Sequence, residues 1–196
     1  MIHPHTKVEL ISPQKGYGVV ATQPLPKGTI TWVQDSLDRV FTPKQYNAFS
    51  DIYKKILDTY TFRNGRGNYI LCWDNEKYVN HSFKPNCLST AYEFEIAIKD
   101  IDVGEELTDD YGYLNISEPF RGLEEGTKRK IVYPDDLRKY YKSWDKKLLS
   151  AIKHINSVSQ ELYIMLPQKT KNTISQVLRG NQKMESILSI YYNQST

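Results

Sequence analysis

Residues 80–86 read Asn-His-Ser-Phe-Lys-Pro-Asn, and residues 104–113 read Gly-Glu-Glu-Leu-Thr-Asp-Asp-Tyr-Gly-Tyr. The first stretch is dense in side chains that hydrogen-bond to backbone groups, which favours a rigid polar loop. A turn with a structural histidine explains His81 taken alone, and a metal site fits worse because no second His or Cys pair lies at ligand spacing. In the second stretch the acidic residues suit a solvated turn. Tyr111 and Tyr113, on either side of Gly112, are harder to explain as core residues on so polar a segment.

A third stretch, Gly16-Tyr17-Gly18, lies between two runs with the composition of β-strands. A Gly-x-Gly pattern is weakly specific, and a tight turn that needs a positive φ is its default explanation. The alternative is functional: the missing side chains would let a ligand lie against the backbone.

Taken together, the three stretches resemble the SET domain family of protein-lysine methyltransferases. Residues 16–22 look like the opening motif of the family, and residues 80–86 resemble its Asn-His-Ser-x-x-Pro-Asn signature. Residues 104–108 with 110–112 resemble its closing signature. The resemblance covers roughly residues 8–113 in the segment order of the family, and its last two motifs are strongly specific.

The resemblance implies an α+β fold: a mainly-β SET domain of the β-clip type, with a helical insertion and a C-terminal α-helical appendage. We expect the SET domain at residues 1–115, with the insertion at about 42–60, and a linker and helical region at 116–196. The family fold also contains a pseudoknot, an unusual topology that would bring the second and third motifs together.

The resemblance further implies S-adenosylmethionine as cofactor. Backbone around Gly16, Tyr17 and Gly18 would hold the amino-acid end of this molecule. Asn80 would contact its methionine portion and His81 its adenine, largely through main-chain groups.

Tyr111 would be the catalytic residue, placed where cofactor and substrate meet, and Tyr113 would help to wall the lysine channel. Methyl transfer from a sulfonium to an amine is an in-line displacement, for which alignment supplies much of the rate enhancement. The lysine amine must be neutral to attack, although its ordinary pKa is about 10.4. Desolvation in an aromatic channel would lower that pKa. No motif residue is an obvious general base, so loss of the proton to water or to the cofactor surroundings is the simpler hypothesis.

Outside the motifs, the patterns predict secondary structure. Strands are predicted at residues 8–11, 19–22, 29–33, 69–73 and 94–98, a short helix after Thr42 and Pro43, and a loop or linker at 116–130. Clean alternation in residues 94–98 predicts one buried and one solvated face. One long amphipathic helix is expected from Pro134 to just before Pro167, followed by one or two further helices.

The sequence also departs from the family pattern. Many members have cysteine at the position of Phe83 and a following Cys-rich segment that binds zinc, but no cysteine follows Cys87 here. We therefore expect no metal site, and we expect the C-terminal helices to cover the adenine, with Phe120 or Trp144 as candidate aromatic lids. For Trp144, packing within the helix stripe is the favoured interpretation.

Composition limits the classes of function. The chain has 196 residues, 39% of them hydrophobic and 25% charged, as in ordinary globular proteins. A formal net charge of +3 does not indicate binding to nucleic acid dominated by electrostatic attraction, so no direct nucleic-acid binding is expected. No apolar run approaches the ~18 residues of a membrane span. Two cysteines and the lack of a secretory signal predict an intracellular protein, cytoplasmic or nuclear.

The predicted function is therefore protein-lysine methylation, on a protein substrate that presents a lysine; histones or other basic proteins are plausible by resemblance alone. The alternative is a catalytically silent SET fold that binds a lysine-bearing partner or the cofactor. The intact Asn80, His81 and Tyr111 count against this alternative. A homodimer through the C-terminal helices is compatible with either function, because an apolar stripe must be buried against the SET core or against a second copy.

Overall fold

The computed structural model describes residues 1–193, and short strands dominate its first two thirds. The strands are β1 (Thr6–Ser12), β2 (Gly16–Ala21), β3 (Ile30–Val33), β4 (Arg39–Phe41), β5 (Thr61–Arg63), β6 (Tyr69–Leu71), β7 (Asn80–His81), β8 (Cys87–Ser89), β9 (Phe94–Ala97), β10 (Glu106–Asp109), β11 (Phe120–Arg121) and β12 (Ile131–Val132). The α-helices are α1 (Pro43–Ala48), α2 (Asp51–Tyr60), α3 (Asp136–Ile152) and α4 (Gln168–Leu178). Single turns of 3-10 helix are η1 (Asn75–Tyr78), η2 (Tyr111–Tyr113), η3 (Tyr163–Met165) and η4 (Ile187–Ile190).

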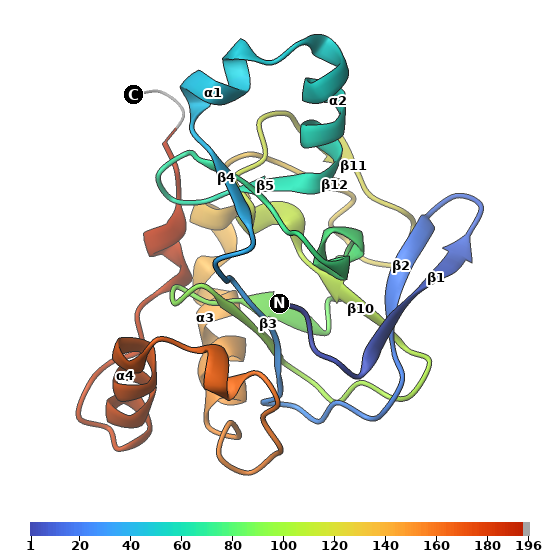
Figure 1. The fold of residues 1–196 in the computed structure, drawn as a ribbon. Helices are drawn as coiled ribbons and strands as arrows, with labels where there is room; N and C mark the ends of the chain where they lie inside the picture. The colour runs from blue at the N-terminus through green and yellow to red at the C-terminus, as the bar shows by residue number, and fades with distance from the viewer. Residues whose placement is uncertain (194–196) are drawn as a thin grey trace.

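The strands form several small sheets in place of one large one (Figure 1). A four-stranded sheet has the order β1-β2-β10-β7, and two three-stranded sheets have the orders β3-β9-β8 and β4-β6-β5. β11 and β12 pair as a separate two-stranded ribbon. This arrangement, with its helices, is the expected α+β fold.

Strand β9 is buried on both faces, so the prediction of one solvated face is wrong. All four of its residues are buried, including Glu95, which is 1% exposed. β9 pairs on one side with β3 and on the other with β8, and α3 packs close to it. The side chain of Glu95 accepts a hydrogen bond from the Thr31 hydroxyl at 2.7 Å. The alternating pattern had predicted that the Glu95 side chain would be hydrated. In the structure its hydrogen-bond partner is the buried Thr31 hydroxyl.

The predicted helical insertion consists of two helices, α1 and α2. Thr42 caps α1 with a reciprocal capping box: its hydroxyl accepts from the Gln45 backbone N–H, and the Gln45 side chain accepts from the Thr42 N–H. Extended backbone at Phe49 and Ser50 separates the two helices. No helix within residues 1–193 is long and apolar enough to cross a membrane.

The predicted long C-terminal helix is wrong in its extent, because α3 ends at Ile152. After α3, Asn156, Ser157 and Ser159 offer side chains that compete with helical backbone bonding. The side chain of Gln160 then joins this turn to the segment at the start of β3. Its oxygen accepts from the Ile30 N–H at 3.0 Å, and its nitrogen donates to the Gly28 carbonyl at 2.7 Å.

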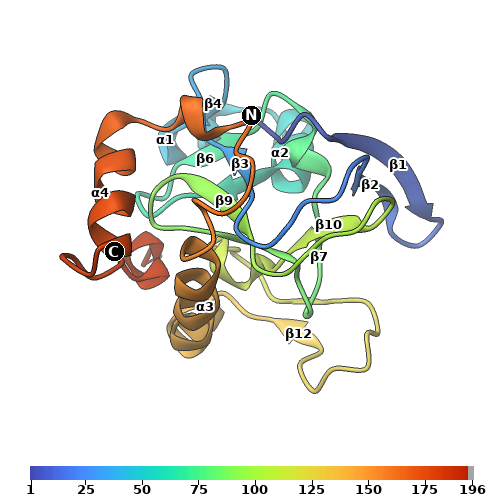
Figure 2. The same cartoon turned by 90° about the horizontal axis from the view of Figure 1, so that it is seen from below.

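The apolar stripe of α3 is buried within its own chain. Leu137, Trp144, Leu148, Ala151 and Ile152 belong to one cluster with residues of β3, β8 and β9. Figure 2 shows α4 at the end of the molecule opposite the β1–β2 hairpin. A homodimer through these helices stays a prediction, and it would need a surface other than the α3 stripe.

Candidate active site

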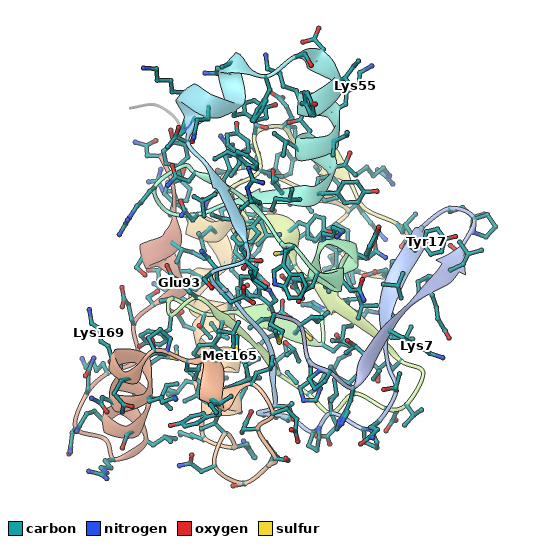
Figure 3. The ribbon with its side chains drawn as sticks, viewed as in Figure 1. Lys7, Tyr17, Lys55, Glu93, Met165 and Lys169 are labelled. Carbon is teal, nitrogen blue, oxygen red and sulfur yellow. The ribbon has the colours of Figure 1, made fainter. Side chains whose placement is uncertain are left out.

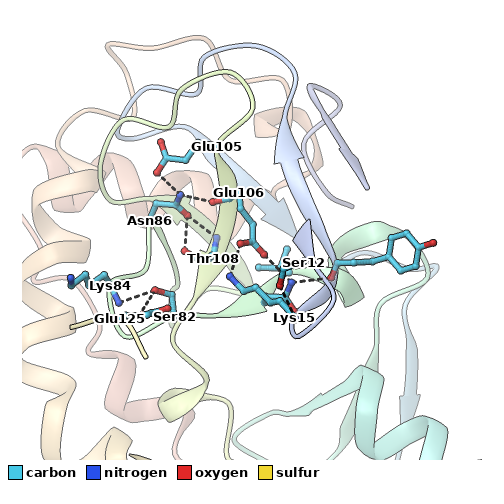
Figure 4. Close-up of polar contacts among 12 residues, drawn as sticks. Ser12, Lys15, Ser82, Lys84, Asn86, Glu105, Glu106, Thr108 and Glu125 are labelled. Carbon is cyan, nitrogen blue, oxygen red and sulfur yellow. Dashed lines mark hydrogen bonds and ion pairs between the residues drawn. The ribbon is translucent and has the colours of Figure 1, made fainter. Parts of the chain in front are cut away.

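The second and third motifs lie side by side because β7 and β10 pair in parallel. Thr108 is opposite Asn80 and Asp109 is opposite His81. Asn86 joins the same two segments: its side-chain oxygen accepts from the Thr108 N–H at 2.7 Å, and its nitrogen donates to the Glu106 carbonyl at 2.8 Å (Figure 4). The structure thus brings together two motifs whose paired residues Asn80 and Thr108 are 28 positions apart in the sequence.

The first motif joins this pair through strand β2, which runs antiparallel to β10. Gly16 has a φ of +79°, a conformation that favours glycine. Gly18 is required for space: a Cβ there would lie 2.5 Å from the Glu106 side chain and 2.9 Å from that of Asn80. Tyr17 is 60% exposed and lies near the tip of the β1–β2 hairpin (Figure 3).

Glu106 and Lys15 add charge to this cluster. The Asn80 side-chain nitrogen donates to the Tyr17 carbonyl at 2.9 Å and to Glu106 Oε1 at 2.8 Å. Lys15 Nζ pairs with Glu106 Oε2 at 2.5 Å, and both side chains are less than one-fifth exposed. Neither residue was predicted as a site residue, although Lys15 directly precedes the first motif and Glu106 lies within the third.

His81 is held as a neutral imidazole. Its Nδ1 accepts from the Tyr111 backbone N–H at 3.2 Å, which leaves the proton on Nε2. Burial, with a further contribution from the positive Arg129, lowers the pKa of His81 to about 4. The buried Nε2 atom has no hydrogen-bond partner among residues 1–193. The site therefore has one buried donor available to a ligand.

Tyr111 lies between these polar groups and a cavity of about 400 Å³. Its hydroxyl donates to the Val79 carbonyl at 2.6 Å. Burial raises the pKa of the phenol, and the nearby Asp109 and Glu76 carboxyls raise it further. Aromatic side chains line much of the cavity: Trp32, Tyr60, Phe62, Tyr69, Tyr111 and Phe120.

Tyr113 is placed differently from Tyr111. It is fully buried, its ring meets Trp144 edge to face, and its hydroxyl accepts from the Ser89 N–H at 3.0 Å. It is absent from the wall of the Tyr111 cavity and lines a neighbouring cavity of about 300 Å³. Trp144 is buried with the other apolar residues of α3, which confirms the prediction that it packs within the helix stripe.

The segment predicted to be a loop or linker, residues 116–130, contains the short strand β11 and otherwise no helix or strand, and it packs against the second and third motifs. Phe120 in β11 packs with its ring 5.3 Å from that of His81 and 6.1 Å from that of Tyr111. Glu125 accepts from the Ser82 hydroxyl at 3.0 Å and from the Phe83 N–H at 2.8 Å. Phe120 was one of the two predicted aromatic lids. It belongs to the β11–β12 ribbon, and not to the C-terminal helices that were expected to cover the adenine.

Arg129 fastens this ribbon to the rest of the chain. Its guanidinium forms ion pairs at 2.5 Å with Asp110, directly before Tyr111, and with Asp136, the first residue of α3. It also lies over the rings of Phe83 and Tyr140, at 5.1 and 4.9 Å. Arg129 lies in the segment predicted to be a loop or linker, but its side chain is only 18% exposed.

Comparison with known families agrees with this geometry. The family model described as SET domain matches residues 16–112, which hold all three motifs. The chain is a SET-domain protein. Proteins of the SET family are in general protein-lysine methyltransferases that use S-adenosylmethionine. No match to the chain was found among curated proteins.

Proposed function

We propose that this SET-domain protein transfers a methyl group from S-adenosylmethionine to a lysine side-chain amine of a protein substrate, by in-line displacement. The observation that carries the proposal is the position of Tyr111, with its hydroxyl bonded to the Val79 carbonyl at the wall of an aromatic cavity. The polar cluster of the three motifs lies on the other side of this residue.

The residues of that cluster fit the cofactor. The amino-acid end of S-adenosylmethionine carries one positive and one negative charge, and Lys15 and Glu106 offer the complementary pair beside Asn80. The unpartnered Nε2–H of His81, with the Phe83 and Phe120 rings against the imidazole, suits a flat heteroaromatic group with acceptor nitrogens. When bound, the cofactor supplies an electrophilic methyl group on a positively charged sulfur.

Tyr111 would orient the amine and stabilise the polarised methyl group. Its hydroxyl proton is committed to the Val79 carbonyl, so the oxygen lone pairs are free to accept from the incoming amine. The raised pKa keeps the phenol neutral at physiological pH. The Val79 carbonyl has a second lone pair, which can make a weak C–H···O contact with the methyl group.

The cavity would take the lysine side chain. Its aromatic walls exclude water from the alkyl chain and, by desolvation, lower the pKa of the amine toward the neutral form that can attack. Tyr113 would support this channel from behind, since its ring is buried and lines the adjoining cavity. Histones and other basic proteins are reasonable first substrates on family grounds alone.

Labelled S-adenosylmethionine with purified protein, core histones and a cell lysate tests the proposal, with mass spectrometry to locate the label. Tyr111→Phe should retain cofactor binding in calorimetry but lose activity by about 10²-fold or more, because a transition-state donor or acceptor is removed. Tyr133→Phe, at a 41% exposed tyrosine of the same chain, is the matched control and should keep full activity. Cofactor binding without any labelled lysine would favour the binding-module alternative, and absence of cofactor binding would refute both.

A further inference from the structure

Three carboxyl side chains lie near Tyr111: those of Glu95 and Asp109, which are buried, and that of Glu76, which is half-buried with a buried Oε2 atom. Glu95 is 1% exposed and Asp109 is 5% exposed. The side chains of these two residues hydrogen-bond to each other, which requires that one of them carries a proton. Burial raises the pKa of all three groups, and repulsion from the other acids raises those of Glu76 and Asp109 further.

Two of these acids face the cavity that Tyr111 lines. Glu76 and Asp109 both belong to its wall. The Glu76 Oε2 atom is buried and has no hydrogen-bond partner within residues 1–193. Trp32 lines the same cavity at 4% exposure, and its Nε1–H likewise has no partner in this part of the chain. Because burying polar groups without partners is costly, these atoms indicate that the cavity is built to receive a polar occupant.

The chemistry of the walls selects a cation at the end of an apolar chain. Aromatic faces attract an alkylammonium, and carboxyl groups at the floor would accept its hydrogen bonds. Two positive side chains also line the cavity. The Arg63 Nε donates to the Asn115 carbonyl at 2.9 Å, while its buried Nη2 has no hydrogen-bond partner within residues 1–193. Lys77 Nζ lies 3.4 Å from the Trp73 carbonyl.

We propose that Glu76, with Asp109 and Glu95 behind it, binds the substrate ammonium in this cavity and accepts its proton before methyl transfer. The inference rests on the proposed function and adds a general base to it. In this step an N–H bond of the ammonium breaks, an O–H bond forms on the Glu76 carboxylate, and the electron pair stays on nitrogen as the lone pair that attacks. The proton later leaves to water at the cavity mouth.

Burial reduces the free-energy cost of this proton transfer from both sides. In water the carboxylate is a poor base for an ammonium, since their ordinary pKa values are about 4.3 and 10.4. Inside the cavity desolvation raises the pKa of the carboxyl and lowers that of the amine, so the two values converge. The Met1 ammonium opposes the shift at Glu76, while Glu95, Asp74 and Asp38 reinforce it, and burial is the largest cause.

The first test uses n-butylammonium chloride as a mimic of the lysine side chain, with n-butanol as the uncharged comparison. Titrations followed by NMR should show saturable binding to the wild type. Glu76→Gln should weaken the binding by about tenfold or more, because a charge-assisted hydrogen bond is lost. Glu118→Gln is the matched control, since Glu118 also lines the cavity but is exposed. Equal affinity of Glu76→Gln and wild type, or no binding to wild type, overturns the proposal.

A second measurement does not depend on any variant folding. In wild-type protein with ¹³C-labelled glutamate, the Glu76 carboxyl signal should report a raised pKa, and n-butylammonium should change its titration. A Glu76 signal that butylammonium leaves unchanged refutes the contact.

With an active substrate in hand, the pH profile separates a base from a structural residue. Glu76→Gln should lose kcat at pH 7 and recover by about tenfold toward pH 9, because the bulk solvent then deprotonates more of the amine. A loss that is the same at every pH contradicts the proton-acceptor role. S-adenosylhomocysteine binding, measured in parallel, distinguishes the two proposals. Without cofactor binding the proposed function fails, while butylammonium binding still reports on the acidic cavity.

Discussion

Replacing Arg129 by methionine should destabilise the protein more than any change to its neighbouring lysines. Methionine keeps an unbranched apolar chain against Phe83 but removes the guanidinium that joins Asp110 and Asp136. The two carboxyl side chains are 4% and 1% exposed, so each loses its charged partner without gaining water.

The magnitude follows from that burial. Removing one partner of a buried ion pair costs about 3–5 kcal/mol, because it leaves an uncompensated charge. The side chain of Arg129 is itself 18% exposed, and Asp110 keeps the Gly112 N–H as a donor at 3.0 Å. We therefore expect a loss near the lower end, about 3 kcal/mol, or roughly 6–12 °C in Tm for a domain of this size.

Urea unfolding at pH 7 measures the loss, with Lys130→Met as the matched control. Lys130 pairs with Glu124 on the surface, where an ion pair contributes about 0–1 kcal/mol. In Arg129→Met the pKa of Asp110, already raised by burial, rises further because the guanidinium no longer lowers it. A folded-state pKa above the unfolded value adds stability at low pH that is lost as pH rises. The deficit should therefore be largest at pH 7 and shrink toward pH 4.

A loss below 1 kcal/mol, or one no larger than that of Lys130→Met, would refute the reasoning. Adding Asp110→Asn to Arg129→Met supplies a second check, since neutralising the carboxylate should restore part of the stability. The single variant Arg129→Met should also weaken cofactor binding, because Arg129 holds the ribbon that places Phe120 against His81.

Two further substitutions test the site. Gly18→Ala should cost about 1–3 kcal/mol and weaken cofactor binding, because the new Cβ would lie 2.5 Å from the Glu106 side chain and 2.6 Å from that of Ile11; unchanged stability and binding would contradict the packing. The pKa of His81 is lowered to about 4 by burial and then by Arg129, so the stability it contributes is complete above its ordinary pKa of 6.5 and is lost as pH falls toward 4. Urea unfolding at pH 7 and pH 4 should therefore show wild type losing about 3 kcal/mol more than His81→Gln over this interval, and parallel losses would show that His81 is not held neutral.

The motifs were readable from the sequence because each is a short local pattern. The residues at 80–86 and 104–113 predicted the SET fold, and with it that these two segments lie side by side. In the structure they do so through the parallel pairing of β7 with β10. Periodicity likewise located β1, β2, β3, β6 and β9, the start of α3 and the buried stripe with Trp144. It did not locate the other, mostly shorter strands.

Tertiary structure alone decided how the polar side chains were used. Nothing local distinguishes Glu95, which is buried against Thr31, from a solvated residue of an alternating strand, and Glu76 gave no signal at all. The turn after α3 is held by Gln160, whose partners at Gly28 and Ile30 are more than 100 residues away in the chain.

The family, five strands of the β-rich core and the candidate catalytic tyrosine could therefore be predicted from the sequence. The contact of the β11–β12 ribbon with the motifs, the ion pairs of Arg129 and the acids near Tyr111 could be found only in the folded chain. The physical reason is that hydrophobic periodicity and motif spacing are properties of neighbours along the chain. Whether a charged group is buried depends on segments far away in sequence that supply its partner or leave it without one.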